Sequence, residues 1–476
     1  MSVAVIGVLL AAAIAFAVAG VAYSRKTVGD LEDYITARGS FGGMTTAATL
    51  VASGMGAWIL FGPVEAATWG GLPAITGYAL GSALPLLAFI ALGRRLRNLM
   101  PEGHTLTEYV FHRYGRGMYT LTLIVMVFYM FIFLAAEITG MALIASLVAG
   151  VPLWTTALIV LTATLAYTTY GGLRASIFTD NVQTTVILPL LAILLAAGYV
   201  LLGGAAPTIS GLSERAPELL SFGHIPGLEG GATFLIAILA ANLFHQGYWQ
   251  RVYAARDERA MTRGFLTAAV VVIPIVFAMG LFGLAAVGLG QAETPSVALF
   301  SVLLDAMPPV LILALVLLGF MLVMSSADTL INGLASLVAV DARRAMPRAR
   351  PHHLLRLSRY STLILAVPLL VIAAQGYSVL YLFLVADLVC AAAVFPVFFG
   401  LYSKRYTGLA ATASTLAALL AGWLLFPNPS MTEGSLFWSF TAAVAVSVAV
   451  SLAMTLLARS SFDMASLARS VRYIKE

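Results

Sequence analysis

Residues 53–63, SGMGAWILFGP, lie in the middle of an apolar stretch and govern how that stretch can cross a membrane. Glycine and proline weaken helical hydrogen bonding within this short segment, at Gly54, Gly56, Gly62 and Pro63. Glycines in membrane helices commonly serve close packing, which is one interpretation of the pattern. The other is a discontinuous helix, whose unpaired carbonyl groups could coordinate a cation near the middle of the membrane.

The composition indicates that the chain as a whole is a membrane protein. Hydrophobic residues make up 61% of the 476 positions, charged residues make up 10%, and the mean hydropathy is +0.97. A soluble chain of this length needs more charge to keep its surface solvated. The sequence contains no phosphate-binding glycine loop, His/Cys metal cluster or nucleophile elbow. We therefore expect a membrane protein that is not an enzyme.

The hydropathy pattern predicts an all-α protein with thirteen transmembrane helices, each long enough to cross roughly 30 Å of hydrocarbon. The first apolar run has no Lys or Arg before Arg25. It therefore lacks the basic region of a secretory signal, which favours a retained first helix. The expected spans are 3–23, 43–66, 72–93, 118–149, 152–169, 180–202, 231–250, 264–290, 308–340, 360–374, 378–399, 407–426 and 435–457.

Basic residues are distributed unevenly among the loops between these spans. Of the 26 Lys and Arg residues, 25 fall on one side, and Arg215 is the exception. The positive-inside rule therefore predicts that the N-terminus lies outside and the C-terminus lies in the cytoplasm. Because the basic residues are spread over these loops, the pI near 9.3 does not point to a nucleic-acid partner. We expect a multi-pass protein of the plasma membrane, specifically a prokaryotic inner membrane, surrounded by lipid.

Several carboxylates fall within the predicted spans, where an ionisable group is energetically expensive. All 26 basic side chains are expected in loops or at helix ends, so no buried cation would neutralise these acids, and a cavity that they line should attract cations. Some of the acids could instead cap helices or pair with hydroxyl groups. Asp180 follows Thr179 at an expected helix start and fits an N-cap, and Glu65 fits the rim of a water-filled vestibule. The acids within spans are Glu65, Glu137, Asp180, Asp328 and Asp387.

The ninth expected span contains SSADTLING, residues 325–333. Ser325 and Ser326 offer adjacent hydroxyl groups, and Asp328 and Thr329 follow within one helical turn. Oxygen ligands suit a small, hard cation such as Na⁺. The plainer interpretation is that serines in a membrane helix bond back to their own backbone.

The seventh expected span is a second candidate for an interrupted helix, because it contains Asn242, His245, Gln246 and Gly247. Five spans separate it from the glycine-rich second span, which is the interval expected if spans 2–6 and 7–11 are inverted repeats. No sequence repeat is visible, so the spacing by itself leaves this arrangement open.

Four motifs, in order and at matching separations, resemble the sodium:solute symporter family over nearly the whole chain, about residues 3–457. Each motif is weak by itself, and the four in register are specific. The motifs are VASGMGAW (51–58), TTYGGLRASIFTDNVQ (168–183), HQGYWQRVYAARD (245–257) and SSADTLINGLASLVAVD (325–341).

The resemblance implies a LeuT-type fold, in which two five-helix inverted repeats alternate access to a central site. It implies one membrane domain, composed of a first helix and loop (1–42), a first repeat (43–202), a second repeat (231–399), two peripheral helices (400–457) and a cytoplasmic tail (458–476). It also implies a sodium site between the second and ninth spans. Its ligands would be the carbonyl oxygens of Ala52, Met55 and Leu322 and the hydroxyls of Ser325 and Ser326. Some family members hold a second sodium, for which the corresponding residues are Asp180, Ser325, Asp328 and Thr329.

Two departures bear on the solute. Proline-type members carry an aspartate where this chain has Gly54, which weakens a transfer of proline specificity. The GYWQ stretch and the segment EGHTLTEYVFHRYG (102–115) resemble the urea/polyamine branch, but that branch tends to have an acid at the position of His245.

Together these features predict sodium-coupled uptake of a small urea-, amine- or amino-acid-like solute by a monomeric symporter. Proton coupling and passive conduction through a channel of the same fold are the alternatives. The solute is expected near the membrane midplane, between the second, fourth, seventh and eleventh spans. A neutral amide-like or cationic amine solute fits carboxylates that no buried cation neutralises. The candidate residues of this pocket are Trp58, Glu137, Asn242 and Asp387.

Overall fold

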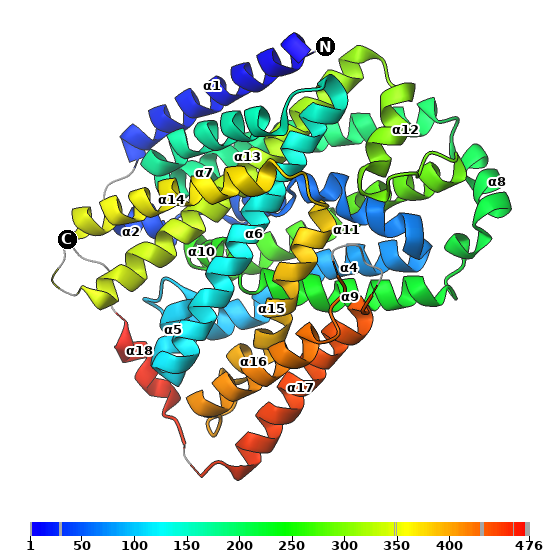
Figure 1. Ribbon diagram of the computed structural model, residues 1–476. Coiled ribbons are helices and arrows are strands. Elements are labelled where there is room, and N and C mark those ends of the chain that lie inside the picture. The colour runs from blue at the N-terminus through cyan, green and yellow to red at the C-terminus, as the bar shows by residue number, and fades with distance from the viewer. Residues whose placement is uncertain are drawn as a thin grey trace.

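The protein is a bundle of long helices joined by short connections (Figure 1). The computed structural model describes residues 2–27, 31–346, 348, 350–428, 433–459 and 461–471. Within them, β-structure is limited to one isolated bridge between Phe41 and Ala255. Residues 28–30 of the first predicted loop and residues 472–476 of the predicted tail lie outside the described residues.

In the described part of the chain, thirteen helices follow the predicted spans, and most of them are long and apolar. They are α1 (Ser2–Thr27), α3 (Gly43–Gly54), α4 (Gly62–Leu99), α6 (Arg116–Ala149), α7 (Leu153–Leu201), α9 (Ile225–Asn242), α10 (Gln246–Ala254), α11 (Glu258–Gly288), α13 (Pro309–Ala345), α14 (Pro351–Ala373), α15 (Val379–Phe399), α16 (Gly408–Trp423) and α17 (Leu436–Leu457).

Short helices connect them. These are α2 (Leu31–Ile35), η1 (Ala57–Leu60), α5 (Leu106–Tyr114), α8 (Ala205–Arg215), η2 (Pro217–Leu220), η3 (Pro295–Val297), α12 (Ala298–Ala306), η4 (Met464–Ser466) and α18 (Leu467–Ser470). The long loop expected at 203–230 is thus largely helical, because α8, η2 and the start of α9 lie within it.

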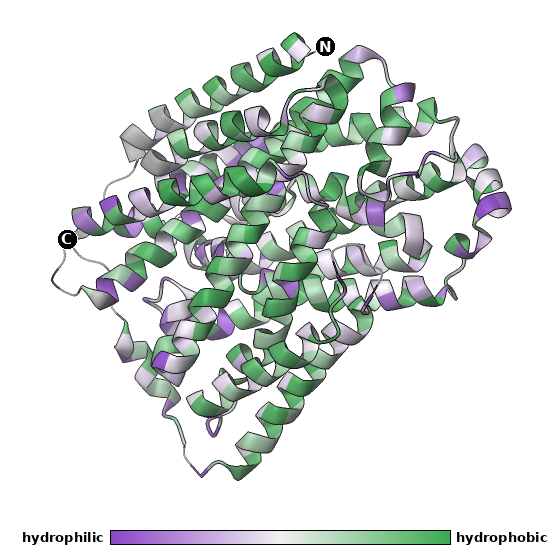
Figure 2. Ribbon diagram, viewed as in Figure 1, coloured by the Kyte–Doolittle hydropathy of each residue, from purple (hydrophilic) through white to green (hydrophobic). Residues whose placement is uncertain are grey.

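The described helices suit a membrane environment. Ten of them are long and apolar enough to cross a bilayer, and three shorter apolar helices accompany them. Hydrophobic residues cover the outer helices, and hydrophilic residues gather at helix ends and connections (Figure 2). Large apolar side chains such as Leu456 and Leu457 are more than four-fifths exposed, as expected for contact with lipid. The number of thirteen spans and the orientation of the termini stay predictions.

Both expected interruptions are present. The second span consists of α3, a non-helical link at Met55 and Gly56, the 3₁₀ turn η1, and the start of α4. The seventh span ends as α9 at Asn242 and resumes as α10 at Gln246, where the Nδ1 atom of His245 accepts a hydrogen bond from the N–H of Gly247. The interrupted-helix interpretation is therefore confirmed for both spans.

Two glycines divide the longest helices. Gly71 in α4 and Gly172 in α7 have φ of 60° and 54°, a left-handed conformation that glycine adopts without strain. They separate the second span from the third and the fifth from the sixth. Because α7 resumes directly after Gly172, Asp180 lies inside a helix, and the interpretation of Asp180 as an N-cap is wrong.

The packing of the long helices places the two broken helices in the interior. α4 packs along α9 and α11, α7 packs against α1, α3 and α13, and α16 and α17 form a peripheral pair beside α15 (Figure 1). α13 contacts α3, η1, α6, α7 and α10, so it touches parts of both broken helices. The serine pair of α13 is therefore held in the centre of the molecule.

A buried histidine connects the loops on the predicted cytoplasmic side. The Nε2 atom of His104 lies 2.7 Å from a carboxylate oxygen of Glu32, and its Nδ1 atom lies 3.2 Å from one of Glu108. Burial by itself would lower the pKa of His104, but the adjacent carboxylates of Glu108 and Glu32 raise it to about 9. Burial would raise the pKa of Glu32, but the hydrogen bond and charge of His104 lower it to about 2.

This cluster should make stability depend on pH. The stabilisation from His104 is fully present below pH 6.5, the ordinary pKa, and is lost as the pH rises through about 9. The loss is on the order of 3 kcal/mol, at 1.36 kcal/mol per pKa unit. The stabilisation from Glu32 is lost only as the pH falls from 4.5 through about 2.

We therefore expect the melting temperature of the detergent-purified protein to fall between pH 6.5 and pH 9.5, and His104→Gln to flatten this dependence. His112→Gln, on the neighbouring helix α5, is the control and should retain the slope of the parent protein. Equal slopes for the parent and His104→Gln would contradict the expectation.

Candidate functional site

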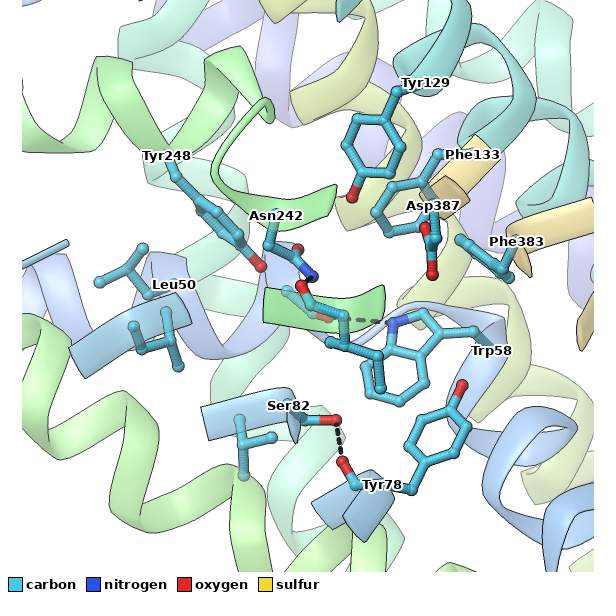
Figure 3. A pocket seen from close by; sticks show the side chains of 14 residues that line it. Leu50, Trp58, Tyr78, Ser82, Tyr129, Phe133, Asn242, Tyr248, Phe383 and Asp387 are labelled. Carbon is cyan, nitrogen blue, oxygen red and sulfur yellow. Dashed lines mark hydrogen bonds between the residues drawn. The ribbon is translucent and has the colours of Figure 1, made fainter. Parts of the chain in front are cut away.

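A small cavity of about 50 Å³ lies between the two broken helices (Figure 3). α3, η1, α4, α6, α9, α10, α11 and α15 each contribute to its wall. Three of the four predicted solute-binding residues line it, namely Trp58, Asn242 and Asp387. The fold therefore brings together three of the predicted residues, which come from three distant spans.

Asp387 is the acidic residue of this cavity. Its side chain points into the hollow beside Tyr129 (Figure 3), and the residue is only 5% exposed. Among the described residues, none forms a hydrogen bond with its carboxylate. A buried carboxylate without such a partner is costly, and ionisable residues within membrane spans commonly face a binding site or a water-filled cavity.

Six of the fourteen residues that line the cavity are aromatic. Trp58 stacks on Tyr78 with ring centroids 5.8 Å apart, and its indole N–H donates to the carbonyl oxygen of Gly54 at 3.0 Å. The remaining aromatic residues of the wall are Tyr129, Phe133, Tyr248 and Phe383. None of these four was among the predicted pocket residues. Tyr129 and Phe133 lie one helical turn apart in the apolar stretch 123–136, so composition gave no reason to select them.

Gly54 fits closely against this wall. A Cβ atom at position 54 would lie 2.7 Å from the hydroxyl oxygen of Tyr248. Any larger side chain therefore requires Tyr248 to move. An aspartate at this position would therefore need space that Tyr248 occupies, besides adding a carboxylate.

Glu137, the fourth predicted pocket residue, does not line the cavity. Its Oε2 atom accepts hydrogen bonds from the N–H of Ala57 at 2.7 Å and from the hydroxyl of Ser326 at 2.8 Å. Its Oε1 atom is buried, and no described residue donates to it. Glu137 therefore joins the restart of the broken second span to the serine pair of α13.

The predicted sodium ligands lie where α3 ends and α13 passes it. Among the described residues, none donates a hydrogen bond to the carbonyl oxygens of Ala52 and Met55, because the helix stops at Gly54. The Ser325 hydroxyl donates to Asp180 at 2.5 Å. The Ser326 hydroxyl can donate to Glu137 or to the carbonyl of Leu322, 3.1 Å away.

This donor set fits a sodium ion. When each serine hydroxyl directs its hydrogen to a carboxylate, its lone pairs are left to bind a cation. Two unpaired carbonyl oxygens stand at the same helix break, and hard oxygen ligands suit small, hard cations. The back-bonded interpretation of Ser326 also holds in part, since its hydroxyl lies within hydrogen-bonding distance of Leu322 and Val323.

A buried arginine lies beside the predicted second set of sodium ligands. The Nη2 atom of Arg251 donates to Asp180 at 2.9 Å and to Thr329 at 2.8 Å, and the Arg251 side chain is 1% exposed. The expectation of no buried cation is therefore wrong, because Arg251 belongs to the last turn of α10 but points inward. Thr49 completes the network by contacting both Arg251 and Asp180.

The other two members of the second set are also engaged. Asp328 accepts hydrogen bonds from Ser176 at 2.7 Å and Thr179 at 3.2 Å, and Ser325 donates to Asp180. Two of the four predicted ligands, Asp180 and Thr329, are thus bonded to a guanidinium group in this structure. The motif HQGYWQRVYAARD contained the signal for Arg251, but only the fold shows which way its side chain points.

The sequence model of the sodium:solute symporter family matches residues 34–418, which include both broken helices and the serine pair of α13. The chain belongs to this family. The family and the relatives described below are transporters rather than enzymes, and they are multi-pass proteins of the lipid bilayer that bind small solutes.

Curated relatives in this family carry different solutes. The chain is 28% identical over 396 residues to the spermidine transporter DUR31 of Candida albicans, covering 82% of this chain and 74% of that protein. It is 27% identical over 310 residues to the sodium/pantothenate symporter of Haemophilus influenzae, covering 62% and 63%. It is 24% identical over 391 residues to the probable urea active transporter 1 of Schizosaccharomyces pombe, covering 75% and 59%.

Solved structures show the same fold at low identity. A Na⁺-coupled sialic acid symporter in a substrate-bound outward-open state superimposes with a TM-score of 0.76 at 16% identity, over 96% of this chain and 98% of the other. MhsT in complex with L-phenylalanine superimposes with a TM-score of 0.55 at 14% identity, over 87% and 98%. The architecture is thus all-helical, and its structural neighbours are transporters of the LeuT-type fold.

Gly56 tests the contact between the helix break and Glu137. A Cβ atom at position 56 would overlap the Glu137 carboxylate, so Gly56→Ala should destabilise the protein by about 1–3 kcal/mol through overpacking. The measurement is the melting temperature. Gly7→Ala is the control, because nothing lies within 4 Å of a Cβ atom there. A melting temperature of Gly56→Ala equal to that of the parent would show that the break does not depend on this contact.

The buried pair of Arg251 and Asp180 gives a second expectation. Removing one partner leaves a buried charge uncompensated, so Arg251→Met should destabilise the protein by about 3–5 kcal/mol. Asp180→Asn/Arg251→Met should recover part of this loss, as measured by thermal unfolding. Arg256→Met is the control, because the Arg256 side chain is 69% exposed. Additive effects of the two single changes would argue against a direct pair.

Proposed function

We propose that this protein is a sodium-coupled symporter that brings a small urea-, amine- or amino-acid-like solute into the cell. The observation that carries this proposal is the pair of carbonyl oxygens at Ala52 and Met55 to which no described residue donates, next to two serines whose hydroxyls can donate to buried carboxylates. The sodium ligands in this proposal are Ala52, Met55, Leu322, Ser325 and Ser326. The solute site is the cavity of Trp58, Asn242 and Asp387, with Glu137 behind it.

The position of the sodium ligands explains how ion and solute binding would be coupled. Trp58 lies in η1, immediately after the helix break that carries Ala52 and Met55. A sodium ion held between that break and α13 would fix the break, and with it the wall of the solute cavity. The solute would then bind more tightly to the sodium-bound protein, and by linkage the ion would bind more tightly when the solute is present.

The energetics of such coupling are sufficient for uptake. One charge crossing 100 mV contributes roughly 2.3 kcal/mol. A tenfold sodium gradient adds about 1.4 kcal/mol. One ion could thus support accumulation of a neutral solute by roughly several hundred-fold, and two ions the square of that.

A second sodium at Asp180, Ser325, Asp328 and Thr329 is an extension of the proposal. Arg251 holds two of these residues in this structure, so binding of a second ion would require the guanidinium to move away. We further propose that residues 43–202 and 231–399 are the two inverted repeats, which is supported by the break near the start of each. The transporter would act as a monomer in the plasma membrane of a prokaryotic cell.

Proton coupling is the second candidate function. Glu137 is fully buried, and no described residue donates to its Oε1 atom. Protonation there would remove the buried charge, and buried carboxylates relay protons in other transporters. The serine pair and the carbonyl oxygens favour sodium, because neither group takes up or releases a proton near neutral pH.

The coupling ion can be tested without knowledge of the solute. We expect the purified protein to melt at a higher temperature in NaCl than in KCl at equal ionic strength, because a ligand at 100 times its Kd stabilises by about 2.7 kcal/mol. Ser325→Ala/Ser326→Ala should abolish the difference. Ser447→Ala, a buried serine of the peripheral helix α17, should retain it.

Identical melting temperatures in the two salts would contradict sodium binding. In that case, uptake driven by a pH gradient would indicate proton coupling, and uptake without either gradient would indicate passive conduction.

A further inference from the structure

A second, larger cavity lies on the predicted outer side of the central cavity. It measures about 460 Å³ and contains two carboxylates, Glu65 and Glu229, together with the aromatic residues Trp69, Tyr381 and Phe437. The Glu65 carboxylate accepts a hydrogen bond from Ser378 at 3.1 Å, which fixes it at the start of α15. Among the described residues, the wall of this outer cavity contains no Lys or Arg.

The same three helices line both cavities. α4 supplies Glu65 to the outer cavity and Tyr78 to the central one. α15 supplies Tyr381 to the outer cavity and Asp387 to the central one. α9 likewise contributes to both walls. Ser378, which holds Glu65, precedes Asp387 by nine residues of α15, or roughly 14 Å along the helix at 1.5 Å per residue. The two cavities therefore succeed one another along α15.

Both cavities contain carboxyl groups. Asp387 is 5% exposed, points into the central cavity and has no hydrogen bond from a described residue (Figure 3). The wall of the central cavity also lacks Lys and Arg among the described residues. Arg251 follows Tyr248 of the central wall by three residues, but its guanidinium group is paired with Asp180. An anionic solute would be repelled by these carboxylates when they are ionised, and a neutral solute could donate a hydrogen bond to Asp387 but could not neutralise its charge.

We propose that the solute is an organic cation with one or more alkylammonium groups, which meets the carboxylates of the outer cavity and then binds Asp387 through an ammonium group. This inference rests on the symport proposed above and names the class of solute. The aromatic rings of the central cavity suit such a group, because cations are attracted to the faces of Trp, Tyr and Phe. The alkyl part of the solute would contact the same rings.

The two carboxylate levels have different roles. Asp387 forms the ion pair in the central site, so it determines whether an amine binds there at all. Glu65 raises the local concentration of cations at the entrance, and this effect grows with the charge of the solute. The outer cavity should therefore favour diamines and polyamines over monoamines.

The test is initial uptake into proteoliposomes with an inward sodium gradient, using four solutes of matched size. These are 1,4-diaminobutane, butylamine, butyramide and butyrate, which carry charges of +2, +1, 0 and −1 near neutral pH. We expect uptake of the two amines and none of butyrate. Asp387→Asn should lower kcat/KM for both amines by roughly 30-fold or more, since losing one member of a buried charge pair costs 2 kcal/mol or more.

Glu65→Gln gives the second arm of the test. It should raise the KM for 1,4-diaminobutane several-fold more than the KM for butylamine, with kcat unchanged. Glu214→Gln is the control, because Glu214 is exposed on α8 and lines neither cavity. A general loss of folding would lower the apparent kcat for both amines and leave their KM values unchanged. Asp387→Glu, which keeps the charge, should retain more amine uptake than Asp387→Asn.

The outcomes separate the two proposals. Uptake of butyramide or butyrate in preference to the amines, or amine uptake unchanged by Asp387→Asn, would overturn the alkylammonium assignment while sodium still raises the melting temperature. Equal effects of Glu65→Gln on both amines would overturn the role of the outer cavity. If sodium does not raise the melting temperature but the amines are still taken up through Asp387, the sodium coupling fails and the solute class stands.

Discussion

The arrangement depends on two buried carboxylates that hold two adjacent serines. Glu137 of α6 accepts from Ser326, and Asp180 of α7 accepts from Ser325. Both acids are fully buried, so each needs hydrogen-bond donors. The broken second span supplies one of them through the N–H of Ala57. Because the surrounding interior is apolar, separating the helix break, the serine pair and the acids would leave buried polar groups without hydrogen-bond partners.

Arg251 extends this network to the second broken helix. It contacts residues of α3, α7 and α13 from the last turn of α10. The two interrupted spans are therefore connected through polar groups in a molecule whose other contacts are largely apolar. A buried polar network of this kind has few alternative arrangements, because each unpaired group costs free energy. In the symport proposed above, binding of the ion or of the solute at one break would therefore alter the other break.

Acidic residues serve three separate purposes in this fold. Glu137 and Asp180 organise the helix break and the serines, and Glu32 and Glu108 bind His104 between the loops. Asp387 alone faces the central cavity without a hydrogen bond from the described part of the chain. Glu137, Asp180 and Asp387 look alike in the sequence, as isolated acids within apolar runs, but they have distinct chemistry. What separates them is whether a hydroxyl, a backbone N–H or an arginine lies within about 3 Å.

The sequence by itself determined the membrane class, the two helix breaks and the residues of the serine pair. Hydropathy and glycine content act locally, through solvation and backbone freedom, and so can be recognised in a linear chain. It also selected Trp58, Asn242 and Asp387 for the cavity. Only the tertiary structure decided that Glu137 supports the helix break, that Asp180 lies within a helix, and that Arg251 points inward. These outcomes depend on which side chains from distant helices meet, and spacing along the chain carries no information about such contacts.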